Sequence, residues 1–184
     1  MDEPKEFTVE DIFNEIDQIY TIFRYSRSSC PYLDPKYEGQ AVSVPFNLPG
    51  GIQTIITYKE PLTKEFISFN NRVGHFTNQN FIIRLYALLE YYQIIGNNIK
   101  IDFNLPGADE LDILRRLRKY FAHRSGPYNK DDEEQVELFN TIESHFHLGK
   151  TDSDDFPISI DTVITPTVNK IKEYISEKLS NKSK

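Results

Sequence analysis

Apolar residues recur at helical spacing along most of this sequence, and the strongest such stretch runs from Asn78 to Ile95. Its apolar face comprises Phe81, Leu85, Leu88, Leu89 and Tyr92. Residues three and four positions apart lie on the same side of an α-helix, so this spacing predicts an amphipathic helix. Asn78 or Asn80 can cap its N-terminus, and Gly96 follows its last turn. A helix with so apolar a face belongs at the centre of a helical fold.

The same periodicity predicts five further helices. The expected segments are Val9 to Tyr25, Leu62 to Asn71, Ala108 to His123, Asp131 to His147, and a last helix that begins at Thr165. Thr8 and Asp11 have the spacing of a reciprocal cap at the start of the first helix. We expect Gly74 to end the short second helix, and Thr165 to cap the last one with Pro166 at its first position.

A β-hairpin is expected between the first two helices. Val42, Val44 and Phe46 alternate with small or polar residues, and residues 52–58 are rich in β-branched side chains. Residues 47–51 between them, Asn-Leu-Pro-Gly-Gly, have turn chemistry. Pro45 would confine its strand to an edge or a bulge. The predicted fold class is therefore mainly all-α, with helix above the ~30–35% average and a small β-hairpin insertion.

Composition limits the domain organisation. The chain has 184 residues and a hydrophobic content of 39%, which suffices for one substantial core and is short for two domains. The single cysteine, Cys30, excludes an internal disulfide, fits a reducing compartment, and has no partner base in the sequence. No apolar run approaches the ~18 residues needed to cross a bilayer. We expect one domain over residues 1–184, located in the cytoplasm.

The distribution of charge along the sequence limits where a nucleic acid could bind. The formal net charge of −7 argues against a broad nucleic-acid-binding surface, because phosphate affinity depends on clustered Lys and Arg. One local patch remains, and we call residues 115–124 the basic segment: it contains five basic side chains, one histidine and no acid. The acidic run Asp131 to Glu134 follows closely, and its simplest interpretation is helix N-terminus chemistry.

Within the basic segment, Arg118 is followed by four residues and then His123, with Ala122 before the histidine. This pattern, flanked by long helices, resembles the R-x(4-6)-H motif of the HEPN superfamily. The resemblance covers roughly residues 66–148. It implies a helical domain, and a metal-independent endoribonuclease of the kind found in toxin–antitoxin, abortive-infection and other defence systems.

The resemblance also implies roles for individual residues. Arg118 would hold the scissile phosphate, and His123 would transfer a proton to or from the reacting oxygens. No metal and no cofactor is expected. The candidates for RNA binding are Arg115, Arg116, Lys119 and Arg124 for the phosphates, with Tyr120 and Tyr128 for stacking on unpaired bases.

Helix geometry limits how the two motif residues could meet. Residues five apart on an ideal helix lie ~140° apart around the axis, so Arg118 and His123 do not share a face. Their convergence needs either a kink before His123 or a second copy of the helix across a two-fold axis, which would bring two of each residue into one cleft. The resemblance implies the second arrangement, because HEPN ribonucleases usually act as homodimers. The partners that it implies are a second copy, single-stranded or looped RNA, and an antitoxin or other regulatory protein.

Three alternatives stay open. Arg118 could pair with a carboxylate and His123 could cap the helix end, as purely structural residues. The domain could be a catalytically inactive HEPN-like module that binds a protein, a nucleotide or RNA, which Lys119 after the motif arginine and the net acidity favour. It could also be an interaction scaffold with chance similarity to the motif. A metal site is not expected, since His145 and His147 lie ~200° apart on a helix.

Overall fold

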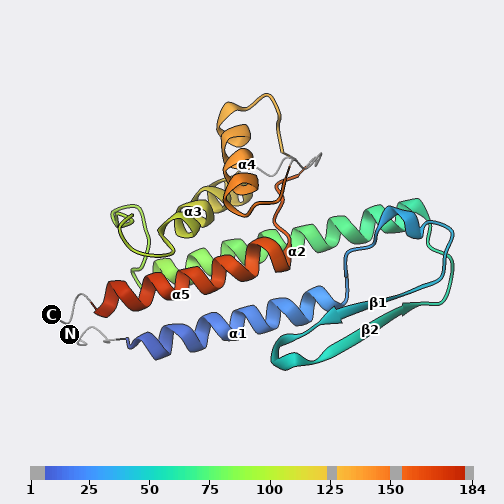
Figure 1. Cartoon of the computed structure of the whole chain (residues 1–184), viewed down its shortest axis with the longest axis horizontal. Helices are drawn as coiled ribbons and strands as arrows, with labels where there is room; N and C mark the ends of the chain where they lie inside the picture. Colours follow the sequence, from blue (N-terminus) through green and yellow to red (C-terminus); the bar gives the residue numbers. More distant parts are fainter. Residues whose placement is uncertain (1–6, 124–127, 150–154, 181–184) are drawn as a thin grey trace. The chain divides into compact units, whose positions relative to one another are not determined.

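The computed structural model of the chain describes residues 7–123, 128–149 and 155–180 (Figure 1). The backbone forms two compact units, one made of Met1–Ile16 with Ile82–Lys184 and the other of Asp17–Phe81. The helices are α1 (Val9–Ser28), α2 (Lys64–Tyr91), α3 (Ala108–His123), α4 (Glu133–His145) and α5 (Thr165–Ser180). Helix makes up 63% of the chain, so the prediction of a mainly helical fold is confirmed.

The predicted β-hairpin is present. Strands β1 (Val42–Asn47) and β2 (Gln53–Tyr58) pair antiparallel, with Val42 opposite Tyr58 and Asn47 opposite Gln53. Pro45 is accommodated because the sheet has only two strands, so each strand is an edge. Alternate residues of the two strands are half-buried. Three of them pack on a cluster of Leu33, Leu62 and Ile67, namely Val42, Val44 and Tyr58.

Helix α1 begins where its capping residues predict. The Asp11 backbone N–H donates to Thr8 Oγ1 at 3.1 Å, and the Thr8 backbone N–H donates to Asp11 Oδ2 at 2.9 Å. This reciprocal pair satisfies backbone donors that the first turn leaves without helical partners. The helix continues to Ser28, three residues past the predicted end.

The predicted break at Gly74 is wrong. Residues 62–71 and 78–95 were expected in separate helices, whereas α2 runs without interruption from Lys64 to Tyr91. Gly74 is inside this helix, and the Arg27 guanidinium packs directly against it. A Cβ atom at Gly74 would lie 2.4 Å from Arg27 Nη1. The glycine therefore provides room for a buried side chain and does not terminate the helix.

Asparagines of α2 also favoured the wrong prediction of a break between residues 71 and 78. They look like caps or turn residues, but they make tertiary hydrogen bonds. The Asn70 amide donates to the Pro31 carbonyl at 2.6 Å, and Asn71 both accepts from the Leu33 N–H and donates to the Leu33 carbonyl, each at 2.8 Å. These bonds hold the segment after α1 against α2.

The last two helices differ from prediction at their ends. Helix α4 is shorter than the predicted 131–147, because Asp132 caps it through the Gln135 N–H and His147 adopts a positive φ beyond its end. Before α5, residues Ile160–Ile164 form a turn of π-helix. Thr165 already has helical backbone angles, so its predicted role as a cap is wrong.

One face of α2 exposes large aromatic side chains. Phe66, Phe69 and Phe76 lie at helical spacing and are 42%, 59% and 61% exposed, and we call them the phenylalanine face. Despite this apolar surface, none of the helices within the described ranges is long and apolar enough to span a membrane.

Candidate functional site

Residues 115–123 of the basic segment form the C-terminal half of α3. Asp109 and Glu110 lie in the first turn of this helix, where carboxylates interact favourably with the positive end of the helix dipole. Three leucines of the helix are fully buried and fix its rotation, namely Leu111, Leu114 and Leu117. The arginines and the lysine between and beyond them therefore lie toward the sides of the helix and its exposed surface.

Three cations of the basic segment are paired with carboxylates. Arg115 binds Asp112 one turn earlier on α3. On α4, Glu137 accepts from Arg116 at 3.0 Å, and Glu134 pairs with Lys119 at 3.1 Å. Acidic residues of α4 thus neutralise part of the positive charge that the sequence concentrates on α3. Pairs this exposed contribute only ~0–1 kcal/mol each, so a phosphate can compete for the cations.

Arg118 has a different environment. Its guanidinium lies over the ring of Tyr86 on α2, with the guanidinium carbon 4.9 Å from the ring centroid. Tyr86 is buried and Arg118 is half-buried. A guanidinium stacked on an aromatic face is held in a defined plane, which is useful for bidentate contact with a phosphate.

The rest of the motif is only partly described. His123 is the final residue of α3, five positions after Arg118, so both belong to one continuous helix. The side chain of His123 and the whole of Arg124 lie outside the described residues. On an ideal helix the two motif positions remain ~140° apart.

The two tyrosines predicted to stack on RNA bases pack within the protein. Tyr120 is only 5% exposed, and its hydroxyl donates to Glu134 Oε2 at 3.0 Å. The Tyr128 ring stacks on Phe139 with centroids 4.8 Å apart and contacts Phe156 edge-on at 5.3 Å. Both rings thus form part of an aromatic cluster around Phe156, which leaves little of the Tyr120 ring open to a base.

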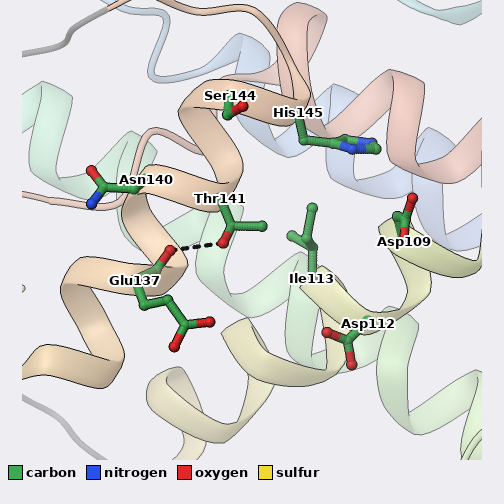
Figure 2. Close-up of a pocket in the computed structure, with 8 residues that line it drawn as sticks. All are labelled: Asp109, Asp112, Ile113, Glu137, Asn140, Thr141, Ser144 and His145. Atoms are coloured by element: carbon green, nitrogen blue, oxygen red, sulfur yellow. Dashed lines mark hydrogen bonds between the residues drawn. The ribbon is translucent and has the colours of Figure 1, made fainter.

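A pocket of about 560 Å³, lined mostly by polar residues, lies between α3 and α4 (Figure 2). Helix α3 contributes Asp109, Asp112 and Ile113, and five residues of α4 complete the lining: Glu137, Asn140, Thr141, Ser144 and His145. Two of its three carboxylates are those paired with Arg115 and Arg116. The third carboxylate is that of Asp109, which is exposed.

A carboxylate–imidazole pair borders this pocket. His145 Nε2 lies 2.9 Å from Glu110 Oε1, and the Glu110 side chain is only 10% exposed. In Figure 2 the His145 side chain points from α4 toward α3. The hydrogen bond fixes the orientation of the imidazole, and its direction depends on the tautomer of His145. Such an imidazole is chemically suited to act as a base or to bind a hydrogen-bond donor.

No sequence pattern points to this pair. In the sequence, Glu110 lies at the start of the motif helix, and His145 is considered only as a metal ligand together with His147. Within residues 7–123, 128–149 and 155–180, no group of three or more His, Cys, Asp or Glu side chains is arranged to hold a metal ion. Recognising the pair requires knowing that α3 and α4 pack together, because its members are 35 positions apart.

Comparison of the chain with protein-family models, with curated protein sequences and with solved structures finds no match.

Proposed function

We propose that the protein is a metal-independent endoribonuclease of HEPN type, with Arg118 and His123 as its catalytic residues. The observation that carries the proposal is the placement of Arg118 on α3, with its guanidinium over the Tyr86 ring and His123 as the last residue of the same helix. The similarity of the motif and of its flanking helices to the HEPN superfamily supports the same assignment. A HEPN-like helical bundle is part of this proposal.

The proposed reaction uses only side chains of the protein. Arg118 binds the scissile phosphate and stabilises the charge that develops on its oxygens. His123 takes the proton of the ribose 2′-hydroxyl, whose oxygen attacks phosphorus, while the bond to the 5′-oxygen of the next nucleotide breaks. An imidazolium returns a proton to the leaving oxygen. The products are a 2′,3′-cyclic phosphate and a 5′-hydroxyl.

The active form in this proposal is a homodimer. Since Arg118 and His123 do not share a helix face, a second copy of α3 across a two-fold axis completes the site. The substrate is single-stranded or looped RNA, and the proposed setting is the cytoplasm, as a toxin or defence effector under the control of an antitoxin or other regulatory protein.

The test is cleavage of labelled single-stranded RNA in the presence of EDTA. Arg118→Ala and His123→Ala should each reduce cleavage by ~100-fold or more. Arg84→Ala, which removes an exposed arginine of α2 outside the site, is the matched control and should cleave within about twofold of the wild type. Equal cleavage by all four proteins would indicate a contaminating nuclease and would refute the assignment.

A second candidate is a catalytically inactive module that binds a protein, a nucleotide or RNA. The pairing of Arg115, Arg116 and Lys119 with carboxylates favours it, because these cations are already partly neutralised. Absence of cleavage by the wild type on every RNA tested would favour this module over the enzyme.

Measuring the RNA affinity distinguishes an inactive module that binds RNA from one that binds a protein or a nucleotide. Glu137→Gln frees Arg116 from its partner, so it should increase RNA affinity and steepen its salt dependence if the basic segment contacts phosphates. Unchanged affinity would instead indicate a protein- or nucleotide-binding module.

A further inference from the structure

The pocket between α3 and α4 is concave, and the proposed cleavage of RNA makes no use of it. Its volume of about 560 Å³ falls within the ~300–1,000 Å³ typical of small-molecule sites. The residues of α3 that line it, Asp109, Asp112 and Ile113, precede Arg118 by more than one helical turn. The pocket is therefore a candidate site for a ligand of its own, and its lining indicates the chemistry of that ligand.

The pocket has two distinct ends, because α3 and α4 run antiparallel along it. Glu110 at the start of α3 pairs with His145, the last residue of α4. Further along α3, Arg116 pairs with Glu137 near the start of α4. Asp109 therefore borders one end of the pocket, and Glu137 borders the other. Glu137 and His145 are eight positions apart on α4, which corresponds to ~12 Å along the helix axis.

An apolar floor separates the two ends of the pocket. Ile113 lies one turn after Asp109 and is only 2% exposed, and in Figure 2 its side chain lies between those of Asp109 and Glu137. The Thr141 hydroxyl donates to the Glu137 carbonyl at 2.8 Å, and its methyl group is the part that points toward Ile113 (Figure 2). The middle of the pocket thus offers contacts to methylene groups rather than to a charge.

Both ends of the pocket present carboxylates, and the described residues that line it include neither lysine nor arginine. Asp109 is exposed at one end. At the other end, Arg116 binds Oε1 of Glu137, and Arg115 binds Oδ1 of Asp112. A carboxylate has two oxygens with about four acceptor positions, so each of these groups can bind a further cation while it keeps its arginine. The lining therefore favours a ligand with a positive charge at each end.

A buried carboxylate adds to the negative charge at the Asp109 end. The Glu110 side chain is only 10% exposed and holds the His145 imidazole by a hydrogen bond of 2.9 Å. The Ser144 hydroxyl also lines the pocket and can accept a hydrogen bond. An ammonium group donates three hydrogen bonds, so it can bind more than one acceptor at this end. The charge of Glu110 strengthens the attraction for such a cation.

We propose that this pocket binds a short aliphatic diamine, with one ammonium group at Asp109 and the other at Glu137. An ammonium–carboxylate contact spans ~2.8 Å, so the ~12 Å between the two ends leaves ~6 Å between the two nitrogens. About four methylene groups bridge that separation, and they lie over Ile113, where they are removed from water. A monoamine occupies one end only. A metal dication has no chain that could reach both ends or cover the apolar floor.

The test is an NMR titration of the ¹⁵N-labelled full chain with 1,4-diaminobutane at low ionic strength. The amide signals of Asp109 to Ile113 and of Glu137 to His145 should shift and saturate. 1,4-Diaminobutane should bind about fivefold more tightly than 1-aminobutane, because it pairs with both ends, and more tightly than Mg²⁺, a dication without a chain. Shifts that spread over acidic residues of the whole chain without saturating would show only general attraction to an acidic protein and would overturn the proposal. Equal affinity for the diamine and the monoamine would overturn it as well.

Variants at the two ends test the assignment of the ammonium groups. Asp109→Asn and Glu137→Gln each remove one charge and keep the shape of an exposed side chain, so the core is undisturbed. Each should weaken binding of 1,4-diaminobutane about fivefold, to the level of 1-aminobutane in the wild type. The matched control is Glu60→Gln, which removes the same charge from an exposed position outside the pocket and should leave the affinity within about 1.5-fold. An equal effect of all three substitutions, or no effect of the first two, would refute the site.

Discussion

Gly107, directly before α3, lies tightly against the backbone of α5. Gly107 has φ +82, and a Cβ atom added there would lie 2.0 Å from the Lys170 carbonyl oxygen and 3.2 Å from Tyr174 Cβ. The carbonyl belongs to the backbone of α5, so it cannot rotate away as a side chain can. Replacing Gly107 with Ala must therefore shift the start of α3 relative to α5.

The loss of stability expected for Gly107→Ala has two contributions. An alanine at positive φ costs about 1–2 kcal/mol, and forcing an extra methyl group into a packed contact costs about 1–3 kcal/mol. Gly107→Ala should thus lower the free energy of unfolding by about 2–5 kcal/mol. For a chain of this size, that corresponds to a fall in Tm of about 4–20 °C.

Thermal unfolding followed by circular dichroism measures this effect, with Gly39→Ala as the matched control. Gly39 also has positive φ, at +76, but no atom lies within 4 Å of an added Cβ, so only the backbone term applies. The control should lose about 1–2 kcal/mol. If both variants unfold at the same temperature, the close contact between the start of α3 and the α5 backbone contributes nothing and the reasoning is refuted.

Three further predictions concern other buried groups. His145→Ala leaves the Glu110 carboxylate buried without its partner and should cost about 1–3 kcal/mol in urea unfolding, whereas Ser144→Ala should cost less than about 0.5 kcal/mol. Burial raises the pKa of Tyr92 to about 12, so this phenol should ionise last in an ultraviolet titration. The pKa of Tyr92 in the folded protein exceeds the ordinary value of 10. The contribution of this shift to the free energy of unfolding is therefore complete below pH 10 and is lost between pH 10 and about 12. Tyr92→Phe should remove this dependence of stability on pH. Asn71→Ala removes two hydrogen bonds to the Leu33 backbone and should cost about 1–3 kcal/mol, and unchanged stability would contradict their importance.

Local signals in the sequence predicted local structure well. Thr8 and Asp11 cap α1 as expected because both partners lie within one turn, and the bounds of α3 were predicted correctly. The hairpin likewise follows from alternation and a turn within about twenty residues. In each case the stabilising contacts join residues close in sequence, so their spacing alone identifies them.

The wrong predictions concern residues whose roles depend on partners far away in the sequence. Gly74 and Asn78 carry the same chemistry as helix-terminating residues, but their partner is Arg27, about fifty positions away. Glu134 belongs to the acidic run that was interpreted as helix N-terminus chemistry. Its pairing with Lys119, and that of Glu137 with Arg116, depends on how α3 and α4 pack. A sequence pattern contains no information on such distant partners, and so the electrostatics of the candidate site became apparent only in the structure.

The phenylalanine face of α2 has a consequence for handling the protein in solution. At low ionic strength the formal net charge of −7 keeps molecules apart by mutual repulsion. Salt shortens the Debye length to about 3 Å at 1 M, and sulfate strengthens apolar association, so repulsion disappears while the attraction between exposed rings grows. The protein should consequently precipitate at modest ammonium sulfate concentrations and bind tightly to phenyl resin. Serine in place of Phe69 and Phe76, the two most exposed of these rings, should raise the salt concentration required for both.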